Sequence, residues 1–404
     1  MRLTTILLYF FLIISIAGQD TIKVTYYNLL DFPEKQQDRV DTLKKILDYI
    51  KPDVFVVNEL TSQYGGDIIK NNALNVNGDT SFASAVFDDG PDTDNLLFYD
   101  QSKLGLYSQS KIVTTLRDIN EYILYHKSSD LSITNDTTFM YFYSLHLKAG
   151  NTINDGIRRN DEAVIFKKYL VNNNLDNRIF IGGDFNFYDS QEQACQQILN
   201  GQGLTLLDPI NQMGSWHNND FYEEYHTQST RSTTGGYAGG SWGGMDDRFD
   251  FIFVSEDVMD ASGGVKYLEN TYLAEGQDGS FFNQPINMYS NTAVPNDIAR
   301  ALFYMSDHLP ISLKFAVGSP IGINNLDKQE IQFVYNPIKK RLNINCDEKE
   351  LEFTVYDIRG SKIISKIGNY KTDFFLDLGS AKKGFYIISC ALNGEIITHK
   401  FVIY

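Results

Sequence analysis

The chain has 404 residues, and its 51 acidic side chains outnumber its 35 basic ones, which gives a formal net charge of −16. Residues 319–404 hold 12 basic and 10 acidic residues, so the first 318 residues carry the excess acid, with 23 basic against 41 acidic. The acidic charge of residues 1–318 argues against binding phosphates through a basic surface, although a bound cation could supply a local positive field.

Length and cysteine content limit the architecture. A chain of this size exceeds one typical core, which predicts two domains or one large domain with an appendage. The three cysteines, Cys195, Cys346 and Cys390, match neither a disulfide-dense scaffold nor a zinc site with paired ligands. Cys346 and Cys390 could pair in an oxidising compartment.

The N-terminus has the pattern of a secretory signal. Met1 and Arg2 give a short basic start, and residues 3–16 are apolar but too few to span a bilayer comfortably. We predict a signal peptide over residues 1–18, with a membrane anchor as the alternative.

Strand, helix and strand follow one another in the next segment. A β-rich run ends at Asn28, and apolar residues then recur at helical spacing over residues 40–50 before Pro52. The run Val54–Val57 is fully apolar and leads to Glu59. Continuous apolar strands joined by a helix predict an α/β sheet covered on its faces, with Asn28 and Glu59 at one edge.

Two further strands end at polar side chains. The β-rich run from Phe139 ends at His146. The apolar run Ile179–Ile181 leads into two glycines, which permit a backbone geometry or a close approach that a Cβ would block. Because residues i and i+2 of an extended chain share a side, Asp184 and Asn186 could reach one ligand together.

The segment 211–245 is rich in Gly, Ser, Thr and Tyr and contains Trp216, Tyr237 and Trp242. Long loops in compact domains tend to be functional or disordered. The aromatic side chains and Arg231 could stack nucleobases, or the segment could be a glycine-rich spacer.

Two later strands also carry charged residues. Asp250 lies among apolar neighbours, so its carboxylate needs a partner. After a second irregular stretch, a strand follows directly on Asp307 and His308.

Taken together, these strands supply acids, amides and two histidines. Oxygen ligands with few soft donors suit Mg²⁺, Mn²⁺ or Ca²⁺ rather than zinc. A histidine with an orienting acid adds proton transfer or charge stabilisation. The candidate residues are Asn28, Glu59, His146, Asp184, Asn186, Asp250, Asp307 and His308.

The order of these residues resembles the endonuclease/exonuclease/phosphatase superfamily, which has the deoxyribonuclease I-like fold. The resemblance covers residues 19–317, which we assign to a catalytic domain. It implies a four-layer α/β sandwich, with two central mixed β-sheets flanked by helices, that cleaves phosphoesters with a divalent metal. The motifs are Tyr-Asn28, Asn-Glu59, Leu-His146-Leu-Lys, Gly-Gly-Asp184-Phe-Asn186, Arg248-Phe-Asp250 and Ser-Asp307-His308-Leu-Pro.

The resemblance also implies roles for single residues. Glu59 looks like the main metal ligand, with Asn28 and Asp307 as supporting ligands. Asp184 and Asn186 resemble the pair that positions and activates the attacking water.

The two histidines have different counterparts in the family. His308 resembles the catalytic histidine, oriented by Asp250, and His146 resembles the second histidine, which faces the leaving group. Nuclease members give the second histidine its own carboxylate partner, and we identify no such residue in this sequence.

The pattern changes after the catalytic domain. Residues 318–328 read as a linker, and alternating apolar residues with glycine turns over residues 329–404 predict a small all-β sandwich. The motifs Tyr335-Asn336-Pro337 and Val355-Tyr-Asp357-Ile-Arg-Gly360 resemble the C-terminal sorting domain of the type IX secretion system. The alternative is a carbohydrate-binding sandwich. The resemblance implies a secreted or cell-surface protein that is exported through the periplasm by the type IX machinery.

We therefore expect a secreted, divalent-metal-dependent phosphodiesterase, a nuclease that hydrolyses extracellular DNA or RNA by in-line attack of water. A sphingomyelinase-like or phosphatase-like hydrolase with the same site is the first alternative. A non-catalytic binding protein on this fold is the second.

Overall fold

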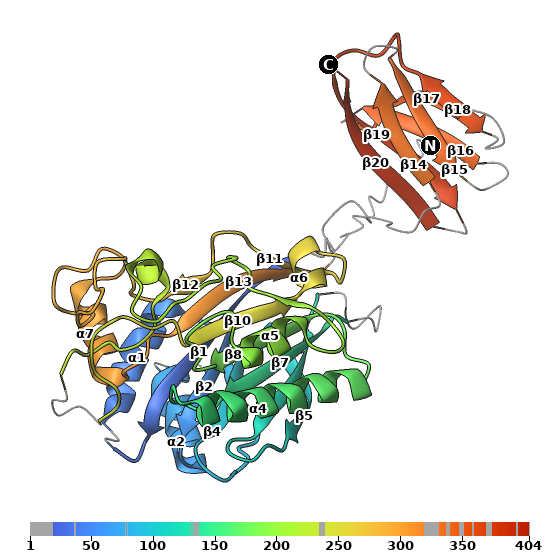
Figure 1. The fold of residues 1–404 in the computed structure, drawn as a ribbon. Coiled ribbons are helices and arrows are strands. Elements are labelled where there is room, and N and C mark those ends of the chain that lie inside the picture. The colour runs from blue at the N-terminus through green and yellow to red at the C-terminus, as the bar shows by residue number, and fades with distance from the viewer. Residues whose placement is uncertain are drawn as a thin grey trace, which may run out of the picture. The chain divides into compact units, whose positions relative to one another are not determined.

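The chain forms two compact units, residues 1–318 and 319–404, in the computed structural model (Figure 1). The predicted signal peptide and most of the predicted linker lie outside the described residues. The structure describes residues 19–404 except 36–37, 77, 79, 130, 132–136, 234–238, 319–330, 337–339, 347–350, 358, 369–373, 393–394 and 404.

The first sheet of the larger unit is mixed and has seven strands. Its order is β11-β13-β1-β2-β4-β3, with β12 also paired to β13. Strands β1 and β2 are parallel, and β1 pairs antiparallel with β13. The strands are β1 (Asp20–Phe32), β2 (Val54–Leu60), β3 (Phe82–Ser84), β4 (Asp94–Asp100), β11 (Val265–Tyr267), β12 (Leu273–Ala274) and β13 (Ile311–Val317).

The second sheet is also mixed, with six strands in the order β5-β6-β7-β8-β10-β9. Strands β7 and β8 are parallel, and β8 pairs antiparallel with β10. The strands are β5 (Leu104–Ile112), β6 (Ile119–His126), β7 (Phe139–His146), β8 (Ile179–Asp184), β9 (Leu206–Leu207) and β10 (Asp250–Ser255).

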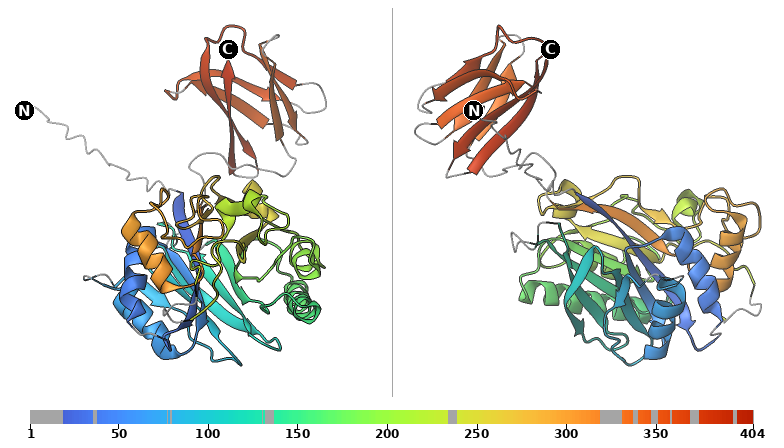
Figure 2. Two further views of the ribbon diagram at one scale, coloured as in Figure 1. Left: turned by 60° about the vertical axis from the view of Figure 1, so that its left-hand side comes forward. Right: turned by 180° about the vertical axis from the view of Figure 1, so that it is seen from behind.

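Helices cover the outer face of each sheet, as the residues of the two main hydrophobic clusters show. One cluster joins α1 and α7 to the first sheet and to the inner face of the second, and the other joins α4 and α5 to the outer face of the second. Figure 2 shows the two helix pairs on opposite sides of the sheets. The helices are α1 (Arg39–Ile50), α2 (Gln63–Ile68), η1 (Ile69–Leu74), α4 (Ile153–Asn172), α5 (Gln193–Asn200), η2 (Asp220–Tyr225), α6 (Glu256–Asp260) and α7 (Asn296–Met305).

The predicted four-layer α/β sandwich is therefore confirmed. Strands β2 and β8 are buried along nearly their whole length, as their continuous apolar sequences predict. Between the sheets, the rings of Phe142 and Phe180 stack at 5.1 Å, and Phe315 approaches Phe180 at 4.5 Å. No helix in the described part of the chain is long and apolar enough to cross a membrane.

The smaller unit is all-β, as its alternating pattern predicts. Its strands form one sheet in the order β14-β15-β18 and another in the order β17-β16-β19-β20. The side chain of Cys346 lies outside the described ones, so its pairing with Cys390 stays a prediction. The strands are β14 (Ile331–Asn336), β15 (Arg341–Cys346), β16 (Leu351–Asp357), β17 (Lys362–Gly368), β18 (Phe374–Asp377), β19 (Gly384–Leu392) and β20 (Glu395–Ile403).

Candidate active site

The ends of the parallel strands β1 and β2 place Asn28 beside Glu59. Their pairing shifts just after Asn28, and Glu59 has a positive φ of 56°. The Asn28 side-chain amide donates to Glu59 Oε1 at 2.9 Å and to Asp184 Oδ2 at 3.1 Å. The N–H of Leu30 donates to Asn28 Oδ1 at 3.0 Å. Asn28 therefore links one acid of the first sheet to one acid of the second.

Three strands of the second sheet bring His146, Asp184 and Asp250 into one row. Asp184 on β8 is paired with His146 on β7 and with Asp250 on β10. The row lies at the C-terminal ends of β7 and β8. It lies at the N-terminal end of β10, because β10 runs antiparallel to β8. Polar side chains that are far apart in the sequence therefore meet at one sheet edge.

The two glycines before Asp184 allow the sheets to approach each other. A Cβ on Gly182 would lie 2.6 Å from the ring of Tyr26 in the first sheet. Gly183 has a φ of 131°, and its Cβ would lie 2.0 Å from the carbonyl oxygen of Leu145. The predicted need for glycine at this strand end is confirmed for both a close approach and a positive φ.

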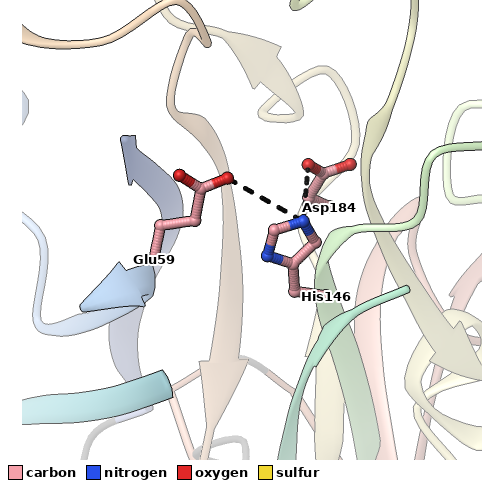
Figure 3. Close-up of side chains that lie close together, drawn as sticks. All are labelled: Glu59, His146 and Asp184. Atoms are coloured by element: carbon pink, nitrogen blue, oxygen red, sulfur yellow. Dashed lines mark ion pairs between the residues drawn. The ribbon is translucent and has the colours of Figure 1, made fainter. Parts of the chain in front are cut away.

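Glu59, His146 and Asp184 form a group that spans both sheets. His146 Nε2 lies 3.8 Å from Glu59 Oε1 and 3.5 Å from Asp184 Oδ2, and Figure 3 shows this nitrogen facing both carboxylates. The buried Nδ1 of His146 has no hydrogen-bond partner among the described residues. The carboxylate partner that nuclease members give this histidine is therefore not found in the described part of the chain.

His308 forms a buried pair with Asp250. Its Nδ1 donates to Asp250 Oδ2 at 2.7 Å, and its Nε2 lies 3.6 Å from Asp184 Oδ2. The side-chain nitrogen of Gln228 lies 2.6 Å from the same Nε2. His308 is thus oriented by Asp250 and not by its sequence neighbour Asp307.

The Asp307 carboxylate faces the loop that precedes β10. Its Oδ2 accepts from the Ser241 N–H at 2.6 Å and from the Gln228 amide at 3.4 Å. A Cβ on Gly240 would lie 2.8 Å from Asp307 Cγ, so the loop packs closely on this acid. Asp307 does not belong to the groups of described His and acid residues whose ligand atoms lie within 4.8 Å of one another.

Asn186 holds Asp184 through the backbone. Its N–H donates to Asp184 Oδ1 at 3.1 Å, and its φ is 53°, a value that asparagine tolerates better than most residues. The Asn186 side-chain amide donates to the carbonyl of Leu147 at 3.2 Å. The pair is therefore fixed against the end of β7.

The acids of the site are crowded. Burial raises the pKa of Asp184 to about 7, and the negative charges of Asp250 and Glu59 add to this, whereas His308 lowers it. Burial also raises the pKa of Glu59, with a further contribution from Asp307, while the hydrogen bond from Asn28 lowers it. Positive charge at this place would relieve the repulsion between the carboxylates.

The pKa values of the two histidines are shifted in opposite directions. Burial lowers the pKa of His308, but the Asp250 and Asp184 carboxylates outweigh this and raise the pKa well above its usual value. Burial lowers the pKa of His146 well below its usual value, and the charges of Arg117 and His308 act in the same direction. One imidazole therefore favours the charged form and the other the neutral form.

The loop predicted to stack nucleobases only partly fits that prediction. Trp216 is fully buried against Phe251, with ring centroids 4.9 Å apart. Arg231 is also buried, and it donates to the carbonyls of Phe303 and Gly239. The stacking role is therefore wrong for Trp216 and Arg231, which stabilise the fold.

Trp242 stays accessible, with 62% of its surface exposed, as does Phe221 of the same segment, with 76%. Trp242 directly follows Ser241, whose N–H donates to Asp307. Tyr237 lies outside the described residues.

Sequence reasoning missed two residues that support the site. Asn58 donates to Ser144 Oγ at 3.1 Å and to the Leu145 carbonyl at 3.2 Å, which joins β2 to β7. A buried amide in an apolar strand is a signal that could have pointed to Asn58. Gln228 lies in an irregular segment, where no periodic pattern marks it.

The residues present fit a divalent cation. Glu59 and Asp184 supply carboxylate oxygens from opposite sheets, and one ligand atom from each of them and from His146 lies within 4.8 Å of the others. Hard oxygen donors with one imidazole match Mg²⁺ or Mn²⁺ better than a soft metal. A cation between the carboxylates would also offset the repulsion that raises their pKa values.

A four-layer α/β sandwich with acids and histidines from both sheets gathered in one place defines a phosphoesterase fold. Residues 25–308 match the sequence model of the Endonuclease/Exonuclease/phosphatase family, and the chain therefore belongs to this family. Residues 334–404 match the model of the secretion system C-terminal sorting domain. Both predicted resemblances are thus confirmed, and the sorting domain implies export to the cell surface or the exterior.

Solved structures with a similar fold are distant in sequence. D. rerio TDP2 complexed with a single-strand DNA product is 16% identical, with 73% of this chain and 98% of that chain covered and a TM-score of 0.47. The human Nocturnin catalytic domain with bound sulfate is 15% identical, with coverage of 74% and 97% and a TM-score of 0.44. ANGEL2, a 2',3'-cyclic phosphatase, is 15% identical, with coverage of 74% and 96% and a TM-score of 0.44. A search of curated protein sequences finds no match.

Proposed function

We propose that the protein is a secreted, divalent-metal-dependent phosphodiesterase that hydrolyses DNA or RNA by in-line attack of water. The observation that carries this proposal is that Glu59 of the first sheet meets His146, Asp184 and His308, with ion-pair distances of 3.5–3.8 Å around Asp184 and Glu59. Phosphodiester cleavage needs positioned acids for the water and positive charge for the phosphoryl oxygens, and this set supplies both.

Glu59 is the main ligand of the metal ion in this proposal, and Asp307 is a supporting one. A bound divalent cation would offset the negative charge that develops on the phosphoryl oxygens. Asn28 presents its amide nitrogen to Glu59 and Asp184, while its oxygen accepts from Leu30. We therefore assign Asn28 the task of orienting the two acids rather than that of a ligand.

Asp184 is the base that takes a proton from the attacking water. Burial raises the pKa of its carboxyl above the usual value, which favours proton acceptance. Asn186 fixes this base through its N–H, which donates to Asp184 Oδ1 at 3.1 Å.

His308 stabilises the charge of the transition state as an imidazolium. The Asp250 carboxylate holds Nδ1 at 2.7 Å, so Nε2 is the nitrogen that can face the phosphoryl group. His146 is neutral and can donate one hydrogen bond near the leaving oxygen.

An accessible aromatic ring beside the site favours a nucleic acid substrate. Trp242 is 62% exposed and follows Ser241, which contacts Asp307 through its N–H. Nucleobases stack on such rings with little dependence on sequence.

The test is hydrolysis by the purified mature protein of plasmid DNA, RNA and sphingomyelin, each with Mg²⁺ or Ca²⁺ and then with chelator. Cleavage of a nucleic acid that stops with chelator supports the proposal. Cleavage of sphingomyelin alone would identify a lipid headgroup hydrolase that uses the same site, and no turnover of any of the three would overturn the proposal.

We propose that residues 329–404 engage the type IX secretion machinery after passage through the periplasm. This unit has its own core, built from β-strands and separate from the core of the larger unit. A chain truncated after Gly318 should melt cooperatively and keep full activity but fail to leave the cell. Loss of the melting transition would show that the sandwich is part of the enzyme.

A further inference from the structure

Gln228 contacts both residues that follow α7 in the site. Its side-chain nitrogen lies 2.6 Å from His308 Nε2 and 3.4 Å from Asp307 Oδ2. His308 Nδ1 is already engaged by Asp250 at 2.7 Å, so Gln228 occupies the other nitrogen of the ring. This is the nitrogen that a phosphoryl group would approach in the proposed reaction.

The segment that carries Gln228 is fixed to both halves of the His308 pair. Thr227 Oγ1 accepts from the Asp250 N–H at 3.2 Å, and the Thr227 carbonyl accepts from the Leu309 N–H at 2.8 Å. The Gln228 carbonyl accepts from the N–H groups of Asp246 and Asp247 at 3.0 and 2.9 Å. The backbone at Gln228 is therefore held in place, and only its side chain is left to move.

Gln228 is also the side chain of this segment that reaches solvent. Thr227, Ser229, Thr230 and Arg231 are all buried, with at most 3% of their surface exposed, whereas Gln228 is partly exposed. Gln228 is thus a partly exposed residue of this segment that contacts His308.

An amide has two different ends, and this matters at His308. With its nitrogen toward Nε2, the amide can donate only to a ring nitrogen that carries no proton. A half-turn of the amide places its oxygen at Nε2 and turns the NH₂ group outward. In this second position the NH₂ group of Gln228 can donate to a substrate.

We propose that Gln228 is a substrate-binding residue of this site: its amide holds His308 against Asp250 in the free enzyme and donates to a non-bridging phosphoryl oxygen when the phosphodiester is bound. This inference rests on the proposed function and adds a residue to it. The Gln228 NH₂ group then contacts the phosphoryl group beside the His308 ring, and such a contact favours a tetrahedral oxyanion as the ligand.

The test compares Gln228→Ala and Gln228→Glu with the wild type on bis(4-nitrophenyl) phosphate and on plasmid DNA. Gln228→Ala should lower kcat/KM by about 10- to 100-fold, the range for a hydrogen bond to a charged group. Glutamate has the same shape and can still accept from His308, but it cannot donate to a phosphoryl oxygen. Gln228→Glu should therefore be at least as impaired as the alanine variant.

Gln277→Ala is the matched control. Gln277 is a buried glutamine of the same unit, and it donates to the His226 carbonyl at 3.2 Å without contacting His308. It should stay within about twofold of the wild type. Near-wild-type turnover by Gln228→Glu would mean that the amide only supports the ring, and the proposal would be abandoned.

The design separates this inference from the proposed function. If the wild type hydrolyses no phosphodiester, the proposed function fails and the role of Gln228 falls with it. If the wild type is active and both Gln228 variants match Gln277→Ala, only the role of Gln228 fails. Thermal melting checks each fold, and the glutamate variant decides alone if the alanine variant does not fold.

Discussion

His308 and His146 approach the same oxygen of Asp184, yet their environments drive them to opposite charge states. Their Nε2 atoms lie 3.6 and 3.5 Å from Asp184 Oδ2. The difference lies at the other ring nitrogen, where His308 has Asp250 at 2.7 Å and His146 has no hydrogen-bond partner among the described residues. The Asp250 carboxylate thus favours the charged form of His308, and His146 has no such partner among the described residues.

Two histidines at one site therefore need not have the same charge. The pKa of His308 is raised by the carboxylates of Asp250 and Asp184 against the effect of burial, and the pKa of His146 is lowered chiefly by burial. A charged and a neutral imidazole can then serve different oxygens of one phosphodiester. The sequence alone offers two histidines but does not rank them.

The largest expected effect comes from breaking the His308 pair. His308→Ala should lower kcat by roughly two to four orders of magnitude with little change in KM, because the ring acts chiefly in the transition state. Asp250→Asn should behave similarly, since it removes the charge that favours the imidazolium. Both are measured as initial rates on one phosphodiester.

The double variant sharpens this prediction. Because Asp250 and His308 serve one function, the double variant should be scarcely slower than the slower single variant. Thermal melting confirms that each protein is folded. Fully multiplicative losses would show that the two residues act independently.

His146→Ala should have a smaller effect. A neutral ring that contributes one hydrogen bond is worth about 1.5 kcal/mol, or about tenfold in kcat. The same rate assay compares it with His308→Ala. A loss as large as that of His308→Ala would mean that His146 carries the charge as well, and the asymmetry would be wrong.

Asp184→Asn should abolish turnover but stabilise the metal-free protein. The pKa of Asp184 is raised from 3.8 to about 7 in the folded state. The free energy of unfolding therefore falls as pH rises between these two values, and above about pH 7 the whole cost of burying the charged carboxylate remains. The asparagine has no charge to bury. At about pH 8 its melting temperature should rise by roughly 2–4 °C per kcal/mol of penalty removed.

The stabilisation should depend on pH and on metal. It should largely vanish at about pH 4, because the carboxyl is then protonated in the folded state and partly protonated in the unfolded state. Saturating Mg²⁺ should stabilise the wild type more than the variant. A variant that melts below the wild type at about pH 8 without metal would contradict the crowding of acids at this site.

The last prediction concerns the pKa values of both imidazole rings, measured in the wild-type protein. The chain has six histidines, so a histidine-labelled sample gives few signals in an NMR titration. The His308 signal should titrate above the usual pKa of His, and the His146 signal should stay neutral to well below it. The single His→Gln variants assign the signals, and two similar midpoints would refute the comparison.

The fold was predictable because each local pattern agrees with the tertiary structure. Apolar runs such as Val54–Val57 and Ile179–Ile181 become buried strands, and both end at the residues that the sequence marks as functional. Side chains that follow such strands are easy to locate, since neighbouring strand ends meet at one sheet edge.

The remaining features could not be predicted from periodicity. Trp216 and Arg231 look like binding residues in a Gly-rich loop, but they are buried against partners that only the tertiary structure brings together. Gln228 lies in the same loop, and nothing in the local sequence points to its contact with His308. Whether a loop residue faces the core or the site depends on long-range packing.

The proposed activity is metal-dependent phosphodiester hydrolysis at the site where Glu59 of the first sheet meets Asp184 of the second. The most direct measurement is the rate on one phosphodiester as Mg²⁺ is titrated into chelator-treated wild type and Glu59→Gln. We predict no activity without metal, full recovery in the wild type, and in the variant a metal affinity or rate lower by roughly tenfold or more, because the site loses one formal charge. Activity that survives chelation, or a Glu59→Gln variant that matches the wild type at every Mg²⁺ concentration, would contradict this proposal.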